Sequence, residues 1–280
     1  MAPWIFGFVI MFLIPMAMSF YYSLTNYNLL SAPSFIGLKN YIRLFTADPS
    51  FWQSLGVTFL YVIVLVPLRL TFSLAIAMLL NSNRRGVGAY RTMYYLPSVI
   101  GGSLAVAIVW KQIFGNNGVV MSLLNALGIE QKMSLIGNPS TALWTLVLLG
   151  VWQFGSSMLI FLAALKQVPG EIYESALLDG ASSWKKFTKI TLPMISPMIF
   201  YLVITGFIGA FKAYSDAGAL FGTNLNAAEM NTIVGYIYDM LYGNSGGYPS
   251  YASAAAIILF SIVLTITCIN LLVSKKHVHY

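Results

Sequence analysis

Six long apolar runs constrain this chain more than any other feature. They cover residues 4–23, 55–81, 94–114, 141–166, 194–214 and 252–274. An α-helix needs roughly 20 mostly apolar residues to cross a bilayer, and each run is about that long or longer. The runs are continuous rather than alternating, which argues against membrane-spanning strands. We therefore expect an all-α, polytopic membrane protein with six transmembrane helices.

The composition agrees with a single membrane domain over residues 1–280. The chain is 58% hydrophobic and 8% charged, with a mean hydropathy of +0.78. Soluble domains carry about 25% charged residues. The lone cysteine, Cys268, excludes an internal disulfide. No basic segment or small-residue cleavage site accompanies residues 4–23, so we interpret this run as a retained helix rather than a cleaved signal peptide.

The net charge of +7 comes from basic residues placed by topology, so it does not predict nucleic-acid binding. These residues gather in two loops and after the last apolar run: Arg84, Arg85 and Arg91; Lys166, Lys185, Lys186 and Lys189; Lys275 and Lys276. The loop 215–251 has no Lys or Arg. By the positive-inside rule, the two basic loops and both termini face the cytoplasm. The loops 24–54, 115–140 and 215–251 then face outward.

Two outward-facing loops carry short helical patterns. Residues 35–45, FIGLKNYIRLF, have helically spaced apolar side chains and predict an interfacial helix. Residues 121–129, MSLLNALGI, predict one amphipathic turn. The third loop, 215–251, is long, polar and rich in Gly and Asn. By their position, this loop and the region 115–140 are the expected docking surface for an extracellular partner.

The polar segment 171–197, EIYESALLDGASSWKKFTKITLPMISP, separates two apolar runs. Its apolar residues recur at helical spacing from Tyr173 to Trp184 and form one stripe. Gly180 allows a bend in this helix, and Pro193 with Pro197 marks the entry into the next run. The segment therefore predicts an amphipathic helical hairpin with an apolar face available for a partner.

This segment resembles the EAA loop of permeases of ATP-binding-cassette (ABC) importers. The matching residues are Glu174, Ser175, Ala176, Asp179, Gly180, Ala181, Phe187, Ile190, Leu192 and Pro193. Ser175 departs from the alanine of the pattern, a change between two small residues. The resemblance extends over essentially the whole chain. FIGLKNY, YRTMYYLPSVIGG, IFGNNGVV, LAALKQVP and GYPSYASAAAIILF are similar to the maltose and glycerol-phosphate type of sugar permease.

The resemblance implies a bacterial cytoplasmic-membrane permease whose loop 167–193 couples to an ATPase. Glu174, Ser175, Ala176, Asp179, Gly180 and Ala181 would form the coupling element. The implied partners are a second permease, a dimer of ABC ATPases, an extracellular solute-binding protein and membrane lipid. The resemblance leads us to expect a different chain as the second permease, in a heterodimer. ATP and Mg would bind to the ATPase. A loop helix lying on the membrane surface is the structural alternative.

The chain lacks the motifs of an enzyme. It has no G-x-x-x-x-G-K-[ST] run for nucleotide phosphates and no H-E-x-x-H run or Cys/His cluster for a metal. We also find no Ser-His-Asp set at a plausible depth. We therefore predict neither catalytic residues, metal ligands nor a cofactor bound by this chain.

Two basic residues within apolar runs point to a solute path. A charge at the bilayer centre costs about 2.5–3.5 kcal/mol, so Arg69 and Lys212 need a partner or a watery route. One or both could line the path of an anionic solute such as a uronate. Alternatively, Lys212 could pair with Asp216 at i+4, and Arg69 could reach the interface or a second permease.

Polar and aromatic residues in the fourth and fifth runs are further candidates for the solute path. The candidates are Gln153, Phe154, Ser157, Phe211 and Tyr214. Amides, hydroxyls and aromatic faces suit a sugar, but ordinary helix packing explains each residue equally well. The resulting prediction is a permease for a carbohydrate, with an oligosaccharide and an acidic sugar as narrower hypotheses.

Three other functions remain as alternatives. The same importer could carry a non-sugar solute. An ion-coupled secondary transporter would require acidic residues within the spans, and the six runs contain none. A membrane-embedded enzyme would require a catalytic set that the sequence does not offer.

Overall fold

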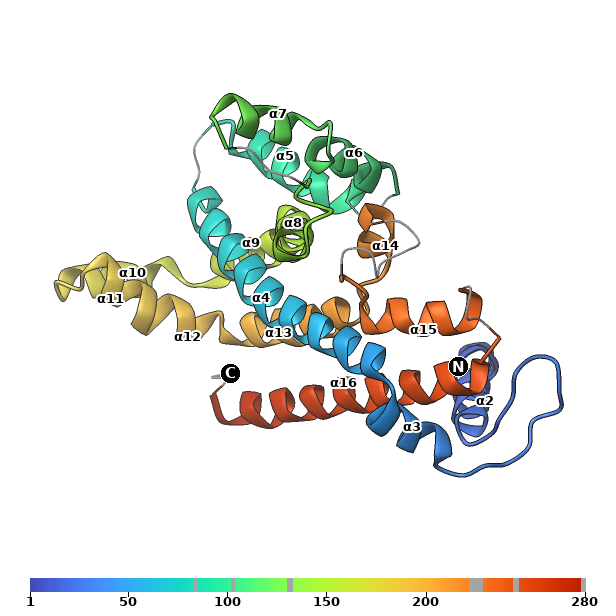
Figure 1. Cartoon of the computed structure of the whole chain (residues 1–280). Coiled ribbons are helices and arrows are strands. Elements are labelled where there is room, and N and C mark those ends of the chain that lie inside the picture. The colour runs from blue at the N-terminus through green and yellow to red at the C-terminus, as the bar shows by residue number, and fades with distance from the viewer. Residues whose placement is uncertain (83–84, 102–103, 130–132, 222–228, 244–246, 278–280) are drawn as a thin grey trace.

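The computed structural model describes residues 1–82, 85–101, 104–129, 133–221, 229–243 and 247–277. Within these ranges the chain is almost entirely helical (Figure 1). The long helix α4 crosses the molecule obliquely and packs against α13, and α16 runs through the lower part of this view. A pair of short helices, α10 and α11, projects from one end. This confirms the all-α membrane fold that the apolar runs predict.

The helices follow one another along the chain with short connections. The first part comprises α1 (Ala2–Phe8), a π-helical turn (Val9–Leu13), α2 (Ile14–Ser23), α3 (Lys39–Ala47), α4 (Pro49–Leu80), α5 (Val87–Ile100), α6 (Leu104–Phe114) and α7 (Val119–Ala126). The second part comprises α8 (Pro139–Trp152), α9 (Gly155–Gln167), α10 (Gly170–Leu178), α11 (Ser183–Lys186), a second π-helical turn (Phe187–Thr191), α12 (Leu192–Met194), α13 (Ser196–Phe211), α14 (Ser215–Phe221), α15 (Ile233–Tyr242) and α16 (Pro249–His277).

Three helical segments are long and apolar enough to cross a membrane unbroken: Ala2–Ser23, Pro49–Leu80 and Pro249–Ser274. Three further pairs of helices pass the same test when each bent pair is taken as one span. The described residues therefore hold up to six spans, in agreement with the six apolar runs. The fourth span bends by 45° between α8 and α9, and the fifth by 67° before α13.

The bend in the fifth span has a sequence cause. Pro197 has no backbone N–H to donate to the preceding helical turn, and its ring clashes with a carbonyl of that turn. A straight helix through this position is therefore disfavoured. The structure places this proline at the start of α13, directly after the short helix α12. Pro193 lies in α12 and Pro197 at the start of α13, so the prediction that they mark the entry to this span is confirmed.

The core of the fold is centred on α4. Its residues Tyr61, Val62, Leu65 and Val66 are buried against α8 and α13. A second apolar cluster joins α4 to α9 through residues such as Ala77 and Phe161. The first span, by contrast, packs mainly on α16 and leaves most of its large apolar side chains exposed. Such a surface suits lipid or a neighbouring protein.

The three loops predicted to face outward contain helices. The predicted interfacial helix is present as α3, and the predicted amphipathic turn as α7. The polar loop 215–251 contains two further helices, α14 and α15. Thr232 caps α15 through a hydrogen bond to its side chain from Gly235 N (3.1 Å). Residues 222–228 and 244–246 of this loop, and the basic residues Arg84 and Lys132, lie outside the described residues.

Candidate functional site

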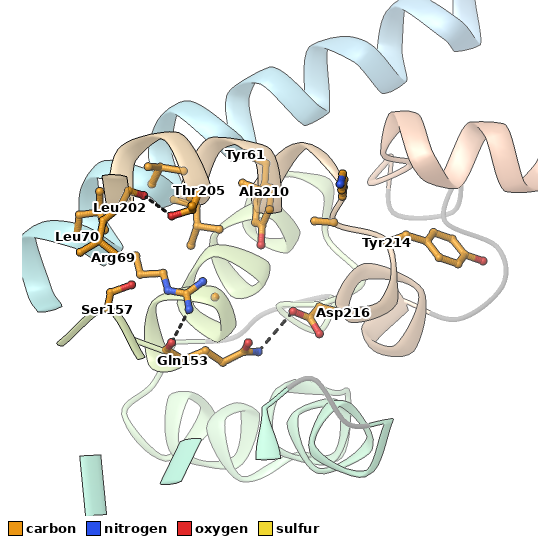
Figure 2. A pocket seen from close by; sticks show the side chains of 17 residues that line it. Tyr61, Arg69, Leu70, Gln153, Ser157, Leu202, Thr205, Ala210, Tyr214 and Asp216 are labelled. Carbon is orange, nitrogen blue, oxygen red and sulfur yellow. Dashed lines mark hydrogen bonds between the residues drawn. The ribbon is translucent and has the colours of Figure 1, made fainter. Parts of the chain in front are cut away.

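A polar cavity of about 320 Å³ lies beside the middle of α4 (Figure 2). Helices α4, α8, α9 and α13 and the segment after α13 contribute its walls. Its polar lining residues are Tyr61, Arg69, Gln153, Ser157, Thr205, Lys212, Tyr214 and Asp216. They come from positions spread over more than half of the chain. The fold therefore gathers polar groups that no local pattern connects.

Arg69 is the cation at one wall of this cavity. Its Nη2 donates a hydrogen bond to the backbone oxygen of Gln153 (2.7 Å). Its Nε is buried and has no hydrogen-bond partner among the described residues. The guanidinium is thus held at one end and retains a donor for a further group. The predicted partner of Arg69 is thus the backbone carbonyl of Gln153 rather than an acidic side chain.

Gln153 connects the surrounding helices at the break between α8 and α9. Its backbone oxygen also accepts a hydrogen bond from Ser98 Oγ (3.0 Å). Its side-chain Nε2 donates to the oxygen of Gly101 (3.2 Å) and, more weakly, to Asp216 Oδ2 (3.4 Å). The carbonyl is available because the α-helical ladder is interrupted at this residue. Gln153 therefore organises the cavity as well as lining it.

Asp216 is a cavity residue that the sequence analysis did not propose for the solute path. Burial raises the pKa of its carboxyl, while the hydrogen bond from Gln153 and the charge of Arg69 lower it. Within the described part of the chain, no ion pair joins it to Lys212. One reason is that α13 ends at Phe211, so the helical i+4 spacing between these residues is lost. The predicted Lys212–Asp216 pair is therefore absent, and both charges face the cavity.

The other predicted path residues divide into two groups. Ser157, Lys212 and Tyr214 line the cavity together with Arg69 and Gln153. Phe154 and Phe211 do not line it. Phe154 packs edge-on against Phe72 (ring centroids 4.8 Å apart), and Phe211 against Phe59 (5.2 Å). These two aromatic residues belong to the packed core that supports the cavity.

The second candidate region is the hairpin formed by α10 and α11. Gly180 lies between the two helices with φ of +72°, a conformation that disfavours side chains. Hydrogen bonds from Gly180 N to Leu177 O (3.0 Å) and from Ala181 N to Ala176 O (2.9 Å) complete a Schellman motif. The predicted bend at Gly180 is thus a defined helix end.

The hairpin exposes large apolar side chains at its tip. Leu178 is 90% exposed and Trp184 is 72% exposed. Among the residues of the predicted coupling element, Glu174, Ser175 and Asp179 are exposed, whereas Ala176 and Ala181 are half-buried. Large apolar side chains exposed on a short projecting element indicate an interaction site.

One side-chain contact ties the hairpin to the membrane span. The hydroxyl groups of Tyr173 on α10 and Thr191 lie 2.9 Å apart and share a hydrogen bond. Thr191 is buried at the end of the π-helical turn that leads into α12 and α13. The hairpin therefore has a specific attachment to the fifth span in addition to its covalent connections.

Comparisons with known proteins identify the family of this chain. Residues 3–276 match the family described as "Binding-protein-dependent transport system inner membrane component". The probable ABC transporter permease protein YesP of Bacillus subtilis is 46% identical over 283 aligned positions, which cover 100% of this chain and 90% of that protein. The arabinooligosaccharides transport system permease protein AraP of the same organism is 32% identical, with 98% and 86% covered.

Solved structures show the same fold. A chain of a bacterial alginate ABC transporter, in complex with an alginate pentasaccharide-bound periplasmic protein, superposes with a TM-score of 0.82 at 23% identity. The match covers 98% of this chain and 92% of that one. Since the family model spans nearly all residues and the relatives are permeases, the chain belongs to the binding-protein-dependent transport system inner membrane components, the permease subunits of ABC transporters.

Proposed function

We propose that this chain forms the translocation path of an ATP-driven carbohydrate importer together with a second permease subunit. The proposal is supported by relatives that are named as permeases for arabinooligosaccharides, for lactose and for starch degradation products. The transported solute is an oligosaccharide, which an extracellular solute-binding protein delivers. A non-sugar solute carried by the same class of importer is the second candidate.

The observation that carries this proposal is the polar cavity beside α4. It combines hydroxyl, amide and phenol groups with the cations Arg69 and Lys212 and the carboxylate of Asp216. Hydroxyl and amide groups suit the many hydroxyls of a sugar, and the excess of one positive charge favours an anionic group. We therefore propose an acidic oligosaccharide, such as a uronate, as the narrower solute class.

The hairpin of α10 and α11 provides the proposed contact with the ATPase dimer. Leu178 and Trp184 would be buried in a groove of the ATPase, and Glu174 would pair with a basic residue there. Movement of the hairpin would reach α13 through the short helices that follow it. ATP and Mg would bind to the ATPase. A conformational change of the ATPase would be transmitted to the permease through the hairpin.

The cavity weakens one argument against an ion-coupled secondary transporter. The sequence analysis disfavours that function because the apolar runs contain no acidic residue. The fold nevertheless brings Asp216, from outside those runs, to the cavity wall. Absence of acids from the runs is therefore a weak argument by itself, and membership of the ABC permease family is the stronger reason to propose ATP-driven import.

Two experiments test the proposal. The tagged chain, extracted in mild detergent, should bring down a second permease and an ATPase. Recovery of the chain alone, from membranes in which known complexes stay intact, would contradict the importer assignment. For the solute, uptake of alginate oligosaccharides and of neutral glucose oligosaccharides should be compared after Lys212→Gln. We expect loss for the charged series only, and equal uptake of both series by the variant would refute an acidic solute.

A further inference from the structure

Three tyrosines form a continuous row from the cavity along α15. The rings of Tyr214 and Tyr238 stack with centroids 4.9 Å apart and an interplanar angle of 29°. The rings of Tyr238 and Tyr242 follow at 5.0 Å and 49°. We call Tyr214, Tyr238 and Tyr242 the tyrosine ladder. At these separations the rings are offset and tilted, so part of each ring surface stays uncovered.

The inner end of the ladder belongs to the cavity. Tyr214 is one of its lining residues, and its ring points away from Arg69, Gln153 and Asp216 toward the α15 side (Figure 2). The ladder thus continues the cavity surface rather than starting a separate site.

The outer end leads toward the start of α4. The backbone N of Ile233, at the beginning of α15, donates to Thr58 Oγ1 (2.8 Å). Further along, the hydroxyl of Tyr236 donates to Asp48 Oδ2 (2.6 Å), next to the first turn of α4. α15 therefore begins beside Thr58, three residues before the cavity-lining Tyr61, and Tyr236 reaches the end of α4 that is predicted to face outward.

The two faces of α15 are used differently. Ile233 and Tyr236 are buried against α4 and α16, and they fix the helix in place. Tyr238 and Tyr242 lie on the other side, one helical turn apart, and are 43% and 73% exposed. Exposure thus increases with distance from the cavity. The ladder rings are not needed to fill the core, since the opposite face does this.

We propose that the tyrosine ladder is a binding surface for the pyranose rings of an oligosaccharide that extends outward from the cavity. This inference rests on the proposed carbohydrate function. A cavity of about 320 Å³ is at the small end of ligand sites, which range from roughly 300 to 1,000 Å³. A longer solute would therefore project beyond it, and the ladder is the aromatic surface continuous with it. Sugar C–H groups pack on open ring faces, and sugar hydroxyls meet the phenol oxygens at the edges.

The test is uptake as a function of oligosaccharide length. The complete importer, with its second permease, ATPase and binding protein, is reconstituted in proteoliposomes and given alginate or neutral glucose oligosaccharides, from disaccharide to pentasaccharide. For Tyr238→Leu we expect kcat/KM for the pentasaccharide to fall about tenfold, while the disaccharide changes less than about twofold. Tyr238→Phe, which keeps the ring, should stay within about twofold of the unsubstituted importer at every length.

Tyr248→Leu is the matched control, because Tyr248 is a similarly exposed tyrosine (52%) of the same region outside the ladder. It should leave the length dependence unchanged. Two results would refute the sugar-binding role of the ladder without refuting the importer function. One is an equal loss of uptake at all lengths for Tyr238→Leu. The other is a Tyr238→Phe importer that is as impaired as the leucine variant. Failure of the unsubstituted importer to take up either series, with an active ATPase, would overturn the proposed function and the ladder with it.

Discussion

The α10–α11 hairpin and the polar cavity are built in opposite ways. The hairpin is local: a few consecutive residues, a glycine with positive φ and an exposed apolar tip define it. The cavity is assembled from α4, α8, α9, α13 and the segment beyond, with Arg69 and Asp216 far apart in sequence. The comparison teaches that a surface for a partner can be encoded in one segment, whereas an enclosed polar site depends on how several helices meet.

The largest expected effect breaks the hairpin. Gly180→Pro fixes φ near −65° where the structure has +72°, and it removes the N–H that bonds to Leu177 O. We expect complete loss of the ATPase from complexes purified through this chain, with the second permease retained. Gly170→Pro is the control, because Gly170 is the first residue of α10, where proline is tolerated. Retention of the ATPase by Gly180→Pro would contradict the assignment of the hairpin as the coupling contact.

The next effect is directed at the cavity. Arg69→Met removes a half-buried cation and one of the two donors to the Gln153 carbonyl. We expect uptake of a charged oligosaccharide to fall more than about tenfold, because a hydrogen bond to a charged group contributes about 1.5–3 kcal/mol. Uptake should be normalised to assembled complex. Arg69→Lys keeps the charge and should retain part of the activity. A methionine variant with unchanged uptake would show that the cation does not serve the solute.

A smaller effect concerns the link between the two regions. Tyr173→Phe and Thr191→Val each remove the hydrogen bond that ties α10 to the fifth span. One such bond contributes about 0.5–1.5 kcal/mol, so we expect about two- to twelvefold less uptake per ATP hydrolysed. Thr191→Val also removes a longer hydrogen bond from Thr191 Oγ1 to Lys186 O (3.4 Å). The double variant should therefore be no worse than Thr191→Val alone, because the bond to Tyr173 is already lost there.

Thr188→Val is the control for this link, since the Thr188 hydroxyl bonds to Trp184 O within its own turn. It should leave the ratio of uptake to hydrolysis unchanged. Additive losses in the Tyr173→Phe, Thr191→Val double variant would show that the two side chains act independently.

The smallest effect is a pH dependence of the cavity. The raised pKa of Asp216 means that it takes up a proton at a higher pH than an ordinary aspartate does. Protonation removes the negative charge beside Arg69 and Lys212, so binding of an anion strengthens as pH falls. We expect uptake of a charged oligosaccharide to rise about twofold as pH falls from neutral toward that pKa. Asp216→Asn should abolish the rise, and neutral oligosaccharides should not show it. A rise that persists in the asparagine variant would assign the effect to another group.

The sequence by itself determined the parts of the protein that depend on local patterns. Apolar runs of sufficient length predicted the all-helical membrane fold, because a bilayer accepts only backbones that satisfy their own hydrogen bonds. The bend at Gly180 and the entry at Pro197 followed from the conformational limits of glycine and proline. Arg69 and Lys212 stood out because charge is rare in an apolar run.

Only the tertiary structure decided which polar residues meet. Asp216 reaches the cavity because α13 ends at Phe211 and the chain continues into α14, which packs on α6 and α8. Phe154 and Phe211 are in the core rather than at the cavity, because the side chain of each points to another aromatic ring. The tyrosine ladder joins Tyr214 to α15, a helix within a loop for which the sequence analysis proposed no helix. These outcomes depend on the packing of helices that are distant in sequence, and a periodic pattern carries no information about that packing.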